Sequence, residues 1–469
     1  MHFWLDSDAG TDQSVFQTVA LMMQKGYMPY LDSFDHKGPL IYLINYWGMM
    51  INKRHGIWII EFIAIWVTYA AIYKIARLYC SKVFSCILVL TSAMLLADYF
   101  KHGNLTEEYA MPFIGVSLYI FLDFLISQKT NAFRLFLCGF GFGAVMMLRP
   151  NMISVWLVFC TAVLTDCLRR RLFLDLLIYL LFFLVGACII TIPIIIWLAH
   201  RHALSAFIEQ YFLFNFLYSS TGMGASLSTK LACVLTFLNP FVYSSQLLTI
   251  TAIISCVFLC LKRERFLYGV YAMYLLITLL LMCMSGYPFN HYGMILVPAI
   301  VFPMASFYQF MLSRRRYAFC MLCIFLLGGI TLPGWFSSLK DMPGIYKAKN
   351  EEHHSDIVLS ICQIIAETSS PEDCISVFGN WNLIYVLSDR RHATKYSYQF
   401  PIGQVSPAIM ESYYSELAEE LPMLIILQSE RSDPRMDSFL KAHGYEEIWR
   451  EEISDPSQIP AKVLKRAGI

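Results

Sequence analysis

The chain is 469 residues long, and 57% of its residues are hydrophobic whereas only 15% are charged; ordinary soluble domains contain about 25% charged residues. Residues 1–339 contain 22 basic and 14 acidic side chains and residues 340–469 contain 13 and 20, so the formal net charge of +1 combines +8 with −7. A soluble enzyme of this length is excluded, and so is a nucleic-acid binder, because the basic residues form no continuous patch. The composition predicts a multi-span membrane protein with one aqueous domain.

Residues 1–56 precede the first long apolar run and are predicted to lie outside the membrane. Apolar positions between Asp12 and Gly26 follow a helical period, which places Asp12 at the start of a short helix. Residues 40–52 are apolar but too short to cross a bilayer, and they predict an interfacial helix. Because no signal-peptide segment precedes this loop, we expect a further helix upstream of residue 1.

Apolar stretches long enough to cross about 30 Å of hydrocarbon recur along the next part of the chain. They predict ten spans, at residues 57–79, 83–100, 109–127, 132–148, 152–168, 172–198, 242–260, 266–285, 294–312 and 317–335. Between the sixth and seventh, residues 206–218 are rich in aromatic side chains and predict a second interfacial helix. Residues 231–241, which include Pro240, predict a half-helix.

Basic residues are concentrated in alternate loops between the predicted spans. Five short loops hold 13 of the 22 basic residues: Arg77 and Lys82; Lys129 and Arg134; Arg169, Arg170 and Arg171; Lys262, Arg263 and Arg265; and Arg314, Arg315 and Arg316. The positive-inside rule places these loops in the cytoplasm. Residues 1–56, the turns 99–108, 149–151 and 286–293, the loop 200–230 and the tail from 340 are therefore expected on the outer side.

The tail from residue 340 has the pattern of a small α/β domain. Apolar spacing predicts helices at 356–367 and 408–421, and short apolar runs predict strands at 374–378 and 423–427. Cys362 and Cys374 either pair or remain free thiols; the sequence leaves both possibilities open. The predicted organisation is therefore an outer loop at 1–56, a membrane domain at 57–339 and an outer α/β domain at 340–469.

Polar residues gather at three places in the predicted outer segments. The candidates are Asp8, Asp12, Asp35, His36 and Lys37 in the first loop, Asn104, Glu107 and Glu108 in the second, and Arg149, His291 and Tyr292 at two outer helix ends. Helix capping by the acids and interfacial anchoring of Arg149 and Tyr292 are the structural alternatives. Carboxylates beside cations at a membrane edge favour group transfer from a lipid-linked phosphate. A carboxylate accepts a proton from the acceptor hydroxyl, and a cation neutralises the departing phosphate.

The first loop also resembles a known family. Asp12-Gln13, then Gly26, Tyr30 and His36-Lys37-Gly38-Pro39-Leu40 resemble the first outer loop of the GT-C glycosyltransferases. The match is to glycosyltransferase family 39, which includes protein O-mannosyltransferases and the bacterial aminoarabinose transferase acting on lipid A. In that family an Asp-Glu pair opens the helix and a Lys-Pro-Pro motif follows. Gln13 stands in place of the Glu and Gly38 in place of the first Pro, so a divalent metal is possible but its role is open.

The resemblance implies an all-α polytopic membrane protein of GT-C type with a small extracytoplasmic α/β C-terminal domain. It implies transfer of a sugar, with inversion, from a polyprenyl-phosphate donor to a hydroxyl of a lipid, glycan or protein acceptor, in a plasma (inner) membrane of bacterial type. Membrane lipids are expected partners and nucleic acid is not. Asp12 would be the catalytic base. Lys37, Arg149, His291 and Tyr292 would bind the donor phosphate, and Asp8, Asp35, His36, Asn104, Glu107 and Glu108 would position sugar or acceptor.

Two other classes of protein fit parts of the sequence. A transporter or lipid flippase would also span the membrane many times, but such proteins usually carry ionisable residues near the bilayer midplane and have repeated halves. The predicted spans are nearly free of charge at their centres, and no repeat is visible. A non-catalytic scaffold whose tail binds a partner is the third class. A transporter or flippase would take up its substrate without forming a covalent product. A scaffold would tolerate replacement of the acidic residues in the outer loops.

Overall fold

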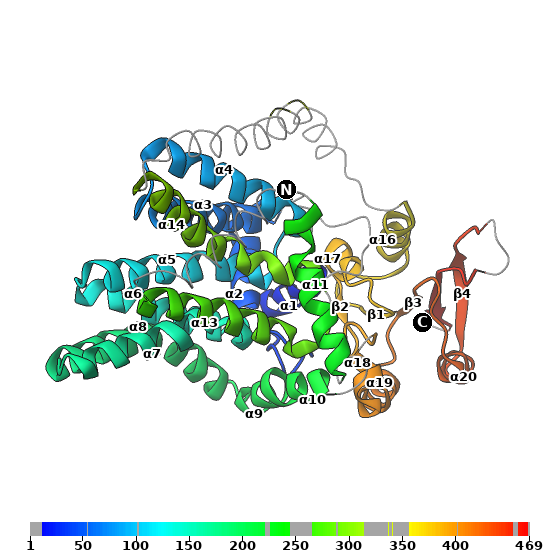
Figure 1. Cartoon of the computed structure of the whole chain (residues 1–469). Coiled ribbons are helices and arrows are strands. Elements are labelled where there is room, and N and C mark those ends of the chain that lie inside the picture. Colours follow the sequence, from blue (N-terminus) through cyan, green and yellow to red (C-terminus); the bar gives the residue numbers. More distant parts are fainter. Residues whose placement is uncertain are drawn as a thin grey trace. The chain divides into compact units, whose positions relative to one another are not determined.

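The computed structural model describes residues 12–53, 55–100, 103–220, 226–243, 265–287, 289–313, 356–400, 402–453 and 458–467, together with Phe336 and Lys340 (Figure 1). The chain forms two compact units. Unit 1 consists of Met1–Ile57, Leu198–Tyr218 and Ala348–Ile469, and unit 2 of Trp58–Trp197 and Ser219–Lys347. Asp8, residues 244–260 of the seventh predicted span and the whole span predicted at 317–335 lie outside the described residues.

Unit 2 is built mainly from apolar helices. They are α3 (Gly56–Arg77), α4 (Lys82–Tyr99), α5 (Thr106–Ser127), α6 (Ala132–Met146), α7 (Ser154–Arg169), α8 (Phe173–His200), α11 (Leu227–Tyr243), α13 (Arg265–Met282) and α14 (Val301–Ser313). Short 3₁₀ helices lie at η1 (Pro150–Met152), η4 (Cys283–Ser285), η5 (Asn290–Leu296) and η6 (Pro298–Ile300). Most predicted spans within the described residues coincide with an α-helix, whereas the span predicted at 294–312 is made of η5, η6 and α14 in succession. Four described segments, Gly56–Arg77, Thr106–Ser127, Phe173–His200 and Asn290–Ser313, are long and apolar enough to cross a membrane.

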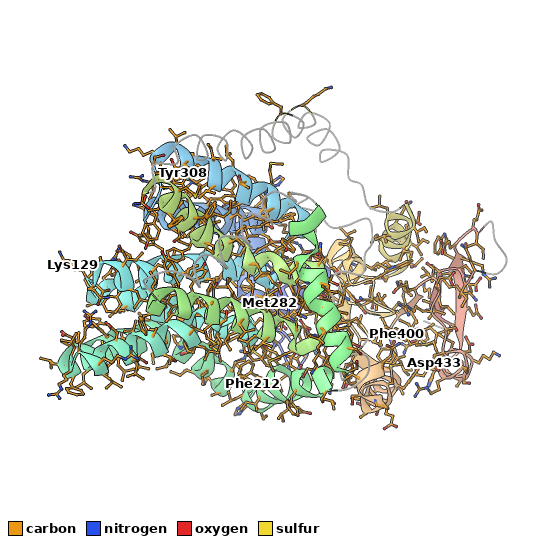
Figure 2. The ribbon with its side chains drawn as sticks, in the orientation of Figure 1. Lys129, Phe212, Met282, Tyr308, Phe400 and Asp433 are labelled. Atoms are coloured by element: carbon orange, nitrogen blue, oxygen red, sulfur yellow. The ribbon has the colours of Figure 1, made fainter. Side chains whose placement is uncertain are left out.

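Close helix contacts hold unit 2 together. In Figure 1, α5 runs beside α6, and α7 beside α13. A Cβ atom at Gly139 of α6 would lie 1.9 Å from the carbonyl oxygen of Phe183 in α8, and one at Gly186 would lie 2.1 Å from that of Phe136. Glycine at such positions lets two membrane helices approach backbone to backbone. Tyr308 of α14, labelled in Figure 2, stacks on Phe84 of α4 with ring centroids 4.0 Å apart.

Unit 1 combines the first loop, a segment near residue 210 and the tail. Its helical parts before the tail are α1 (Asp12–Gln24), α2 (Pro39–Ile51), α9 (Leu204–Phe207), the π-helix η2 (Ile208–Leu213) and α10 (Phe214–Ser220). Helices predicted to start at Asp12 and to cover 40–52 and 206–218 are thus observed. α1 packs on α2, where Ala20 and Leu21 cluster with Met49 and the ring of Phe16 meets that of Tyr42.

The tail of unit 1 carries one five-stranded sheet. Its strands are β1 (Cys374–Phe378), β2 (Arg391–His392), β3 (Leu424–Leu427), β4 (Tyr445–Arg450) and β5 (Lys462–Arg466). Their order is β2-β1-β3-β5-β4, with β1 parallel to β2 and β3, and β5 antiparallel to β3 and β4. The helices are α16 (Asp356–Thr368), α17 (Leu383–Ser388), α18 (Ile402–Val405), α19 (Pro407–Glu420) and α20 (Pro434–Ala442). Both predicted helices and both predicted strands are confirmed within a residue or two, and Cys362 and Cys374 are free thiols.

Candidate functional site

In unit 1, an acid and a cation from the predicted first-loop site lie side by side. Asp12 is the first residue of α1, and its side chain is 49% exposed, whereas the side chain of Lys37 is only 11% exposed. The Lys37 Nζ lies 3.8 Å from Asp12 Oδ2 and 3.1 Å from His36 Nε2. The carboxylate is therefore accessible, and the ammonium beside it is held on a largely buried stem.

The backbone of the loop that carries Lys37 is fixed by buried tyrosines. Tyr30 has a φ of +69°, an uncommon conformation for a bulky residue. Its hydroxyl donates to the carbonyl oxygen of Lys37 at 2.8 Å, and the hydroxyl of Tyr42 lies 3.2 Å from the same oxygen. Gln210 closes the loop from the other side: its amide Nε2 donates to the Tyr30 carbonyl at 2.6 Å, and its Oε1 accepts the N–H of Asp35 at 3.2 Å.

His36 is held by the aromatic segment that follows η2. Its ring stacks on Tyr218, with centroids 5.5 Å apart, and lies 5.6 Å from the ring of Phe214. The side-chain amide of Asn215 donates to the His36 carbonyl oxygen at 2.6 Å. These contacts fix both the ring and the backbone of His36, which explains how its Nε2 stays beside the Lys37 ammonium.

Asp35 is the most enclosed acid of this loop, being 2% exposed. Its Oδ2 accepts the hydroxyl of Tyr42 at 2.8 Å, and its Oδ1 accepts the hydroxyl of Tyr398 at 2.9 Å and the N–H of His36 at 2.8 Å. Burial raises the pKa of Asp35 above its ordinary value, while the charge of Lys37 and the hydrogen bonds from Tyr42 and the His36 N–H oppose that rise. The carboxylate is thus surrounded by donors from the chain itself.

In unit 2, Glu107 and Arg149 form a largely buried ion pair. Arg149 Nη1 lies 2.5 Å from Glu107 Oε1, with the side chains 14% and 3% exposed. Thr106 donates its hydroxyl to the other carboxylate oxygen at 2.9 Å. The guanidinium also lies 3.9 Å above the ring of Tyr292, whose ring meets that of His291 edge to face at 4.7 Å. A guanidinium has five N–H donors, so this pairing does not exhaust Arg149.

A second group of acids surrounds the turn before α5. Glu61 of α3 is buried, and its Oε1 accepts the N–H of Asn104 at 2.9 Å. Glu108 is also buried and interacts electrostatically with Glu61. Gly103 has a φ of +94°, and a Cβ there would lie 2.4 Å from Glu61 Oε1. Asn104 accepts the Tyr109 hydroxyl at 3.0 Å. These contacts position the start of α5, and with it Glu107.

The predicted residues therefore fall into two groups. Asp12, Asp35, His36 and Lys37 lie together in unit 1, and Asn104, Glu107, Glu108, Arg149, His291 and Tyr292 lie in unit 2. Sequence reasoning missed the residues that hold them: Tyr42, Gln210 and Tyr398 in unit 1, and Glu61 in unit 2. Gln210 could have been noticed as an amide inside an aromatic run. Tyr398 is 363 residues from Asp35 and gives no local signal.

Metal ligation was left open by the sequence. Within the parts of the chain that the structure describes, no three His, Cys, Asp or Glu side chains are grouped as metal ligands.

A protein-family profile matches part of this chain, and several solved structures share its fold. The profile of the family described as dolichyl-phosphate-mannose-protein mannosyltransferase matches residues 36–197. No curated protein sequence matches. Among solved structures, ArnT from Cupriavidus metallidurans bound to undecaprenyl phosphate is similar with a TM-score of 0.61 and 12% identity, covering 97% of this chain and 94% of that one. The chain has the GT-C glycosyltransferase fold.

Two archaeal structures agree. The Archaeoglobus fulgidus oligosaccharyltransferase in complex with Zn and sulfate has a TM-score of 0.52 and 13% identity, covering 89% of this chain and 64% of that one. AglB from Archaeoglobus fulgidus, in complex with an inhibitory peptide and a dolichol-phosphate, has a TM-score of 0.50 and 13% identity, covering 91% and 66%. The predicted resemblance to GT-C enzymes is thus confirmed. The chain is a multi-pass membrane protein with a small C-terminal sheet domain.

Proposed function

We propose that this GT-C chain is an integral membrane glycosyltransferase that moves a sugar from a polyprenyl-phosphate donor to an acceptor hydroxyl. The observation that carries the proposal is the exposed carboxylate of Asp12 placed 3.8 Å from the largely buried ammonium of Lys37. A base open to an incoming hydroxyl and a fixed cation for a phosphate are the two groups that such a transfer needs. The GT-C fold supports the same class of reaction.

The proposed step is a single displacement at the anomeric carbon. The acceptor oxygen attacks that carbon from the face opposite the phosphate, and its proton passes to the Asp12 carboxylate. The bond between the anomeric carbon and the phosphate oxygen breaks, and polyprenyl phosphate leaves with the electron pair. Lys37 neutralises the charge that develops on the leaving phosphate. The configuration of the sugar inverts, because only one displacement takes place.

The residues of unit 2 have supporting roles in this proposal. Arg149 and His291 assist in binding the donor phosphate, and Tyr292 supports the guanidinium through its ring face, 3.9 Å away. Glu107 holds Arg149 through their ion pair. Asn104 and Glu108 shape the turn that positions Glu107. We further propose that the reaction takes place on the extracytoplasmic side of a bacterial plasma membrane, with a lipid, glycan or protein acceptor.

Replacement of Asp12 tests the proposed base. Membranes containing Asp12→Asn should lose transfer from a labelled polyprenyl-phosphate sugar, because an amide cannot accept the proton. Asn and Ser support helix N-termini about as well as Asp, so Asp12→Asn and Asp12→Ser both leave the start of α1 intact. If the only role of Asp12 were to cap α1, both variants would keep the transfer activity.

The control is an acidic residue that caps a different helix, in the C-terminal tail. Asp433 accepts the N–H of Arg435 at the start of α20, and Asp433→Asn should transfer sugar at the wild-type rate. Near wild-type turnover of Asp12→Asn, measured beside this control and at equal protein level, would overturn the assignment of Asp12.

A further inference from the structure

We propose that Tyr398, from the C-terminal α/β part of unit 1, is a positioning residue for the Lys37 ammonium and acts through Asp35. This inference rests on the proposed function, because it assigns Tyr398 to the binding of the donor phosphate. It makes the tail a component of the donor site. Asp35 accordingly acts on Lys37 and His36 from within the protein, and does not need to touch the sugar.

Several contacts join the loop before Lys37 to the tail. The N–H of Phe34 donates to the Lys395 carbonyl oxygen at 2.7 Å, and the rings of Phe34 and Tyr396 lie 5.3 Å apart. The Ser33 hydroxyl lies 2.9 Å from His392 Nε2. The loop is therefore fixed along its length by β2 and the segment that follows it, and Tyr398 lies in that segment.

The hydroxyl of Tyr398 reaches the Asp35 carboxylate, which is hydrogen-bonded within the loop. It donates to Asp35 Oδ1 at 2.9 Å, and both side chains are buried. The N–H of His36 donates to the same oxygen, and Tyr42 bridges the other oxygen to the Lys37 carbonyl. Rotation of the Asp35 carboxylate would therefore move the backbone on both sides of Lys37. The Tyr398 hydroxyl blocks that rotation.

Removing this hydroxyl should weaken donor binding without unfolding the protein. In Tyr398→Phe, Asp35 keeps its hydrogen bonds from Tyr42 and from the His36 N–H but loses one of three donors, so the carboxylate turns more easily. We expect the dissociation constant for polyprenyl phosphate to rise about fivefold, while the KM for the acceptor stays unchanged. Asp35→Asn should weaken binding similarly, because its amide keeps the shape and one acceptor oxygen but not the charge.

The test is a titration of the purified full-length chain with polyprenyl phosphate. A double-mutant cycle separates positioning from general damage: in the Asp35→Asn background, Tyr398→Phe should add little, because it acts through the same carboxylate. The matched control is Tyr413→Phe. Tyr413 is fully buried in the same tail and hydrogen-bonds Ser376 at 2.9 Å, without contact to Asp35. It should lower the unfolding temperature as Tyr398→Phe does, yet leave the dissociation constant unchanged.

Three results would overturn the proposal, and they have different meanings. If the wild type binds polyprenyl phosphate and Lys37→Ala weakens this binding, but Tyr398→Phe behaves like Tyr413→Phe, the positioning role is wrong and the proposed function stands. If the wild type does not bind polyprenyl phosphate at all, the proposed function fails and the inference fails with it. Additive effects of Asp35→Asn and Tyr398→Phe would also contradict it.

Discussion

The ion pair between Glu107 and Arg149 allows a quantitative prediction for unit 2. The two side chains are 3% and 14% exposed, and the carboxylate and guanidinium are in hydrogen-bond contact. Removing one partner of such a buried pair costs about 3–5 kcal/mol, because the other charge is left uncompensated. Tyr292 keeps its contact with the guanidinium, so we expect the lower end, about 3 kcal/mol, for Glu107→Ala.

Glu107→Gln should cost less, about 2 kcal/mol, because its amide oxygen still accepts from Arg149 although the guanidinium charge stays uncompensated. The double variant Glu107→Ala/Arg149→Met should recover most of the loss, since both charges leave together. The assay is thermal unfolding of the purified protein in a single detergent, and the unfolding temperatures rank the variants by stability. The control is Asp166→Ala, which removes a more exposed ion pair with Arg170 and should change stability by less than about 0.5 kcal/mol. Equal unfolding temperatures for Glu107→Ala and Asp166→Ala would refute this reasoning.

Three further predictions concern stability. His392 is buried, which lowers its pKa to about 4 from 6.5; the unfolded chain therefore binds the proton more readily, and stability should fall by roughly 3 kcal/mol as pH drops from 6.5 to 4. His392→Asn should flatten that dependence in thermal unfolding measured across this pH range; an unchanged slope contradicts the assignment. Gly103→Ala should lower the unfolding temperature more than Gly26→Ala, because both have positive φ but only the first would clash; equal losses contradict the clash. Gly139→Ala should separate α6 from α8 and reduce the yield of folded protein from membranes, and wild-type yield and stability would contradict that close packing.

Much of the fold could be predicted from the sequence, because the spacing of apolar residues and the length of apolar runs are local properties of the chain. The helices of unit 2 follow apolar runs, and in the tail α16, α19, β1 and β3 follow their apolar spacing. The short strand β2, of two residues, carries too little pattern to be noticed. The antiparallel strands β4 and β5 contain charged residues such as Glu447 and Lys465 among their apolar ones. Their pairing depends on tertiary contacts, which the sequence pattern does not show.

The candidate site was predictable only in its residue types. Asp12 and Lys37 were identified from charge and from resemblance, and the structure places them together. The buried state of Asp35 was not predictable, because two of its neighbours, Gln210 and Tyr398, come from distant parts of the chain. The pairing of Arg149 with Glu107 likewise depends on how two helix ends meet, which no local pattern encodes.

The central claim is covalent transfer from a polyprenyl-phosphate sugar, and the most direct measurement follows that donor in proteoliposomes of the purified chain. With an extract of cell-envelope acceptors present, the account predicts that free polyprenyl phosphate appears one for one with an inverted glycoside, and that Asp12→Asn and Lys37→Ala abolish or sharply reduce both. Passage of the intact donor across the bilayer by the wild type, with no glycoside formed and no effect of Asp12→Asn, would contradict the account and indicate a transporter.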